Sequence, residues 1–113
     1  MNKFPLMSKY ELMWMMVLFD LPVVETQERK DATAFRNFLL DCGFSMVQYS
    51  IYIKILSGTD ACDKYYNLIE KSLPKKGKVD ILTITDRQYE NIKSYCSRDK
   101  IQKKNQSQQY LLF

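Results

Sequence analysis

The side chains available for chemistry are limited by a composition that contains no histidine. Ser-His, Cys-His and His-metal mechanisms are therefore excluded, and carboxylates, hydroxyls, thiols, lysines and tyrosines remain. The three cysteines, Cys42, Cys62 and Cys96, lie too far apart for a CxxC redox or zinc pair. Their odd number favours a reducing compartment over secretion, so we expect a cytoplasmic protein.

Asp20 is the acidic residue with the most informative position. It ends the longest apolar run of the sequence, residues 12–19, and in a strand it would share a face with every second residue of that run. We expect this row to be buried, where a carboxylate must be paired, protonated, metal-bound or at the mouth of a cleft. Two copies meeting at a two-fold axis would bring together two Asp20 carboxylates, which could hold Mg²⁺ and assist phosphodiester hydrolysis. The alternative, which spacing alone favours, is that Asp20 caps the following turn.

The elements that must position Asp20 follow from periodicity. The run before it is apolar at odd and even positions alike, which is typical of a central strand buried on both faces. Beyond it we predict a helix over 25–42, a hairpin of two short strands over 44–56, a helix over 60–73, a strand over 78–85 and a short helix from a Thr85-x-x-Gln88 capping box through Tyr95. The order is βαββαβ with an appendage, and the fold class is α+β.

A sheet in this order has helices on one face only, because both right-handed crossovers place them on the same side. Leaving the other apolar face in water is unfavourable by about 25 cal/mol per Å². A homodimer packed through the two sheets supplies the missing cover most simply. The longest apolar run is far shorter than the roughly 20 residues that span a bilayer, so no membrane partner is expected.

The last part of the chain differs from the rest in composition. Residues 97–109 are rich in Lys, Gln and Ser and contain one bulky apolar residue, Ile101. We therefore predict a domain over 1–96 and a flexible arm with an edge strand over 97–113. The arm ends in four apolar residues, Tyr110, Leu111, Leu112 and Phe113, which we expect to bind a sheet edge of the same protomer or of a partner.

Several strings of this sequence, spread over residues 10–95, together resemble a known family. They are Phe19-Asp20-Leu21-Pro22, the helix end from Phe35 to Phe44, Val47-Gln48-Tyr49-Ser50-Ile51-Tyr52, the turn Pro74-Lys-Lys-Gly77, and the stretch from Leu82 to Tyr89. In order and spacing they are similar to the Cas-two family of CRISPR-associated adaptation proteins, particularly to members from systems with a single large effector nuclease.

The resemblance implies a ferredoxin-like homodimer with an extra C-terminal strand. Such a dimer acts in spacer acquisition, where it bridges two dimers of the Cas-one integrase and binds duplex prespacer DNA. Some members are described as metal-dependent ribonucleases or deoxyribonucleases, and Asp20 matches their Mg²⁺ ligand. Arg36, Gln48 and Ser50 match family positions near the same cleft. The residues from 97 onward match the family only in character, and the terminal residues, 110–113, suit the family strand that completes a sheet across the dimer and meets the integrase.

Basic residues are the expected contacts to DNA of arbitrary sequence, because such DNA is bound through its phosphates. Residues 64–113 carry 11 basic and 5 acidic residues, whereas residues 1–63 carry 6 and 8. We predict a phosphate-binding cluster in the turn between the second helix and the last strand, with further contacts from the first helix. The candidates are Lys75, Lys76, Lys78, Arg29, Lys30 and Arg36.

Two other interpretations use the same element order. An RNA-recognition-type domain is suggested faintly by residues 43–49, although Met46 takes the place of a stacking aromatic. A small toxin-like, metal-dependent ribonuclease of similar fold is the other alternative.

Overall fold

The computed structural model describes residues 11–96 of the 113-residue chain. The predicted arm over 97–113, with its four terminal apolar residues, lies outside the described residues, as do residues 1–10 of the predicted domain. The elements follow one another as β1 (Leu12–Asp20), α1 (Thr26–Asp41), β2 (Ser45–Gln48), β3 (Ile51–Ser57), α2 (Thr59–Lys71), β4 (Lys78–Thr85) and α3 (Asp86–Glu90). This confirms the predicted βαββαβ order and the α+β class.

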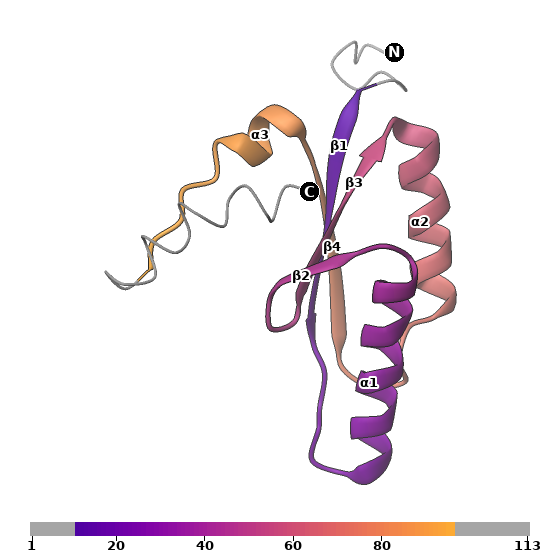
Figure 1. Cartoon of the computed structure of the whole chain (residues 1–113). Coiled ribbons are helices and arrows are strands. Elements are labelled where there is room, and N and C mark those ends of the chain that lie inside the picture. Colours follow the sequence, from indigo (N-terminus) through magenta and orange to yellow (C-terminus); the bar gives the residue numbers. More distant parts are fainter. Residues whose placement is uncertain (1–10, 97–113) are drawn as a thin grey trace.

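The four described strands form one sheet in the order β2-β3-β1-β4. Every neighbouring pair is antiparallel, and β1 lies between β3 and β4. Helices α1 and α2 cover one face of this sheet, while the short α3 lies on the other side (Figure 1). The arrangement is consistent with a ferredoxin-like fold and places Asp20 at the end of a central strand.

The core lies between the sheet and the two long helices. Met13, Met15, Val17 and Phe19, on one face of β1, are buried against apolar residues of both helices, such as Leu39 of α1. Burial of such side chains is the largest favourable contribution to folding. The central position of β1 therefore fixes the strand end that carries Asp20.

The long helices begin and end close to their predicted limits. The first turn of α1 carries the capping-box pair Glu25 and Glu28, and the Glu28 side chain accepts the backbone N–H of Glu25. Gly43 follows α1 with φ of +92°, a value that side-chain-bearing residues rarely adopt.

The short helix was predicted too long. The Thr85/Gln88 capping box is present, as expected, but α3 ends at Glu90 and not at Tyr95. Residues 91–96 are all exposed, so a longer helix would have buried no apolar face in this chain.

The face of the sheet opposite α1 and α2 is apolar, as predicted. It carries Met16 and Leu18 of β1, which are half-buried, together with Leu82 of β4 and Ile55 of β3, which are exposed. We call these four residues the open apolar face. Among the described residues, none of the helices is long and apolar enough to cross a membrane.

Candidate functional site

Asp20 lies at the solvent-exposed end of its row. Along that row Trp14 is buried, Met16 and Leu18 are half-buried, and Asp20 is exposed. In the single chain the Asp20 end of the row is uncovered, because the sheet ends here and α3 covers only the opposite end of the row; the expected burial of the row beneath a second sheet stays a prediction. The carboxylate is hydrated, so one chain by itself imposes no burial penalty on it.

Two turns hold the end of β1 from either side. The Phe19 N–H donates to the carbonyl oxygen of Ser50 at 3.0 Å, which attaches the β2–β3 turn to the residue before Asp20. On the other side Asp20 is paired in register with Lys78 of β4. Ser50 has φ of +66° and Gly77 has φ of +97°, so both turns use backbone conformations that most residues avoid.

Gly77 approaches the backbone of Asp20 closely. A Cβ atom at this position would lie 2.7 Å from the Asp20 carbonyl oxygen and 2.8 Å from Leu21 Cδ2. Only glycine fits there without displacing the strand end. The Pro74-Lys-Lys-Gly77 turn, which the sequence marked for its charge, is therefore also a packing element beside Asp20.

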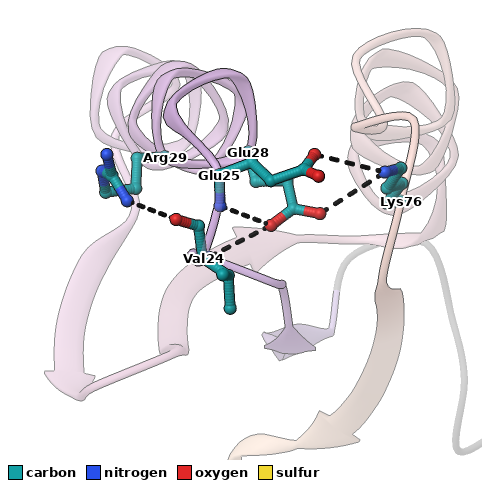
Figure 2. Close-up of polar contacts among 5 residues, drawn as sticks. All are labelled: Val24, Glu25, Glu28, Arg29 and Lys76. Atoms are coloured by element: carbon teal, nitrogen blue, oxygen red, sulfur yellow. Dashed lines mark hydrogen bonds and ion pairs between the residues drawn. The ribbon is translucent and has the colours of Figure 1, made fainter.

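The loop after Asp20 is held by Glu28 (Figure 2). Its Oε1 accepts the backbone N–H groups of Val24 and Glu25 at 3.1 and 3.0 Å, and its Oε2 lies 3.4 Å from Lys76 Nζ. The Glu25 N–H and the Lys76 ammonium together hold the pKa of Glu28 below its ordinary value. Arg29 completes the loop by donating to the carbonyl oxygens of Val23 and Val24.

The predicted cationic cluster is partly neutralised within the chain. Lys75, Lys76 and Lys78 are all exposed, as expected for a turn. However, Lys76 Nζ lies 3.4 Å from Glu28 and 3.8 Å from Glu25, and Lys78 Nζ lies 3.6 Å from Asp80. Carboxylates at these distances lower the local positive potential, although exposed pairs of this kind are weak.

The predicted cations of α1 and the family-matched polar residues are spread over the fold. Arg29 is engaged by the backbone, as described above, whereas Lys30 is exposed and Arg36 is half-buried. All three belong to the helix on the face opposite the Asp20 row. Of the matched polar residues, Gln48 ends β2 and Ser50 lies in the turn next to Phe19.

The Asp20 carboxylate is a suitable ligand for a divalent cation, but the described residues of one chain do not complete a ligand set. Mg²⁺ prefers carboxylate oxygens and water, and Asp20 presents a hydrated carboxylate. Within residues 11–96 there is no group of three His, Cys, Asp or Glu side chains placed to hold a metal ion. A single chain therefore offers one carboxylate, and further ligands must come from water, substrate or a second chain.

Two features of the structure, one beside Asp20 and one at the opposite end of its row, were missed from the sequence. The role of Glu28 was available in principle, because Glu25-x-x-Glu28 before an apolar helix is a capping-box pattern. The contact of Trp14 with Asp86 joins residues 72 positions apart and has no local sequence signal.

Comparisons with known proteins identify relatives of this chain. A family model described as CRISPR associated protein Cas2 matches residues 13–92. A protein of Paracidovorax avenae is 43% identical over 108 residues, which cover 96% of this chain and all of the relative. A protein of Flavobacterium psychrophilum is 37% identical over 107 residues, covering 95% of this chain and 93% of the relative. Both relatives are named CRISPR-associated endoribonuclease Cas2. The chain belongs to the CRISPR-associated Cas2 family.

Proposed function

We propose that the chain is a homodimeric scaffold of CRISPR spacer acquisition that bridges two dimers of a Cas-one integrase and binds duplex prespacer DNA. The observation that carries the proposal is the open apolar face, Met16, Leu18, Ile55 and Leu82. Covering it with a second copy gives a two-fold symmetric body with two equivalent sides. Such a body suits an adaptor between two identical partners, and membership of the Cas2 family supports the CRISPR context.

Duplex DNA would be held through its phosphates. The exposed side chains of Lys75 and Lys30 are the first candidates in the described residues. Lys76, Lys78, Arg29 and Arg36 are expected to contribute less, because the first three already contact carboxylates or carbonyl oxygens and Arg36 is half-buried. The terminal residues 110–113 stay the predicted contact to the integrase.

The test is co-purification with an integrase of the same CRISPR locus, followed by size measurement with and without duplex DNA. We expect one joint complex that contains two copies of this chain, and whose DNA affinity falls steeply as salt rises. Failure to form a joint complex at any salt concentration would contradict the scaffold role.

A second candidate function is Mg²⁺-dependent endoribonuclease activity, and the names of the relatives favour it. Asp20 would hold the ion, with its counterpart in a second chain as the other carboxylate. When bound, Mg²⁺ would stabilise charge on the phosphodiester and lower the pKa of a water molecule. Gly77 and Ser50 would keep the strand end that carries Asp20 in one position.

Asp20→Asn tests this activity and separates it from the scaffold role. Asp80→Asn is the matched control, because Asp80 is exposed and lies on the same sheet face, one row from Asp20. Loss of metal coordination removes several kcal/mol of transition-state stabilisation, so we expect Asp20→Asn to reduce RNA cleavage by about 100-fold or more. Asp80→Asn should cleave normally, and both variants should still form the integrase complex. Equal cleavage by the two variants would contradict the role of Asp20.

A further inference from the structure

A second cluster of side chains lies on the sheet face opposite the long helices. The Trp14 ring stacks on Tyr89 of α3, with ring centroids 4.0 Å apart and planes 13° apart. The indole Nε1–H of Trp14 donates to Asp86 Oδ1 at 2.7 Å. We call Trp14, Asp86 and Tyr89 the tryptophan clamp. It leaves Trp14 only 6% exposed.

The clamp is what holds α3 in place. A helix of five residues is far too short to be stable by itself, and its capping box organises only the first turn. The aromatic stack and the indole hydrogen bond attach α3 to the central strand. The helix packs on β1 and β4. Burial, and then the charge of Asp86, raise the pKa of Tyr89.

Over β1 and β4, the clamp divides the sheet face into a covered end and an open end, whereas Ile55 of β3, the cross-strand neighbour of Trp14, stays 44% exposed. At the covered end, α3 lies near the start of β1 (Figure 1), and its Asp86 and Tyr89 contact Trp14. At the open end, Met16, Leu18 and Leu82 approach solvent and lead to Asp20. The sheet of a second copy, packed on this face, would collide with α3 if it were shifted toward the covered end.

The open end also carries charges of both signs. Asp20 and Lys78 form one cross-strand pair, and Asp80 pairs with Leu18 in the next row. A surface that carries both signs lets a second copy of the same surface pair opposite charges across a two-fold axis, in addition to its apolar contacts. The partner that fits it is a second copy of this chain.

We propose that the tryptophan clamp sets the register of the dimer, by blocking the Trp14 end of the sheet and directing the second copy to the Asp20 end. The inference rests on the proposed homodimer and adds to it a device that selects one packing from several. Without the clamp, Trp14 and the residues around it become additional apolar surface, and the second sheet can slide along the face.

Two pairs of variants open the clamp or leave it closed. Tyr89→Leu removes the stack, whereas Tyr89→Phe keeps it. Asp86→Ala removes the acceptor of the indole N–H, whereas Asp86→Asn keeps an acceptor oxygen. Trp14 is the sole tryptophan of the chain, so its fluorescence reports the clamp directly. In dilute protein the opened variants should show red-shifted emission and stronger acrylamide quenching than their controls.

The register is measured as the distance between the two chains. A spin label at Val24→Cys, an exposed position in the loop after Asp20, is combined with Cys42→Ser and Cys96→Ser, while the buried Cys62 is left in place. With the clamp closed, in the parent and in Tyr89→Phe and Asp86→Asn, we expect one narrow distance distribution. In Tyr89→Leu and Asp86→Ala we expect it to shift or split.

The outcomes separate this inference from the proposed function. A dimer whose distance distribution is the same with the clamp open and closed would overturn the register role and leave the homodimer standing. A parent protein that gives no distance between chains, and sediments as a single copy, would overturn both. Because the two opened variants act on different contacts, a folding failure of one leaves the other as a test.

Discussion

At the scale of single residues, Asp20 is set apart by its position and not by unusual surroundings. Asp20 was selected from the sequence because it ends an apolar run. In the structure it lies at the end of a central strand, in register with Lys78. Its exposure in the single chain could not be predicted, because strand periodicity gives the face of a residue and not the depth of cover above it.

Gly77→Ala tests how tightly the turn before β4 packs on Asp20. The new Cβ would meet the Asp20 carbonyl oxygen at 2.7 Å in a strained backbone conformation. We expect the free energy of unfolding to fall by about 2 kcal/mol or more. Gly43→Ala is the matched control, because its φ is +92° and its new Cβ meets only the flexible end of Lys54. Urea unfolding that shows a larger loss for Gly43→Ala than for Gly77→Ala would contradict the packing argument.

Glu28→Gln tests the network that holds the loop after Asp20. Because folding lowers the pKa of Glu28, its charged form stabilises the fold above the unfolded pKa of about 4.3, and this stabilisation is lost as pH falls through the lower folded value. The free energy of unfolding should therefore fall more for the parent than for Glu28→Gln as the pH is lowered from about 6 to about 3. Lys76→Gln, which keeps the two backbone hydrogen bonds, should fall between them in urea unfolding. Parallel pH profiles for all three proteins would contradict this role.

At the scale of elements, the strongly periodic segments were predictable and the short ones were less so. The central strand and the two long helices appear within two residues of the predicted limits, because each has an apolar pattern that burial reinforces. The hairpin break near Ser50 was also predicted. The end of α3 was not, because the helix is held by contacts of its Asp86 and Tyr89 with Trp14, more than 70 residues away, and such contacts have no local sequence signal.

Leu39→Ala tests the packing of α1 on the sheet. Leu39 is fully buried, so we expect the free energy of unfolding to fall by about 2–5 kcal/mol. The neighbouring Leu40 is 50% exposed, and Leu40→Ala should change the free energy of unfolding by about 0.5 kcal/mol or less. Chemical denaturation of both variants checks the difference. Similar losses would mean that α1 packs through a different side.

At the scale of the whole molecule, the sheet has two unequal faces, and the function proposed here depends on the second. One face is filled by α1 and α2. On the other face α3 covers Trp14, while the open apolar face stays uncovered, including Ile55, the cross-strand neighbour of Trp14. The presence of that apolar surface was predictable, because a central strand that is apolar on both sides needs cover on both. The clamp across one end of it was not predictable, because it arises only from the tertiary structure.

The most direct test of the account is the association state of two leucine variants, measured by analytical ultracentrifugation. Leu82 lies on the open apolar face and Leu40 lies on α1, and each is 50% exposed. A buried unpaired carboxylate opposes packing by several kcal/mol, so Leu82→Glu should sediment as a single folded copy. The parent and Leu40→Glu should sediment as two copies. A Leu82→Glu protein as dimeric as the parent, or a parent that sediments as one copy, would contradict packing through the helix-free face.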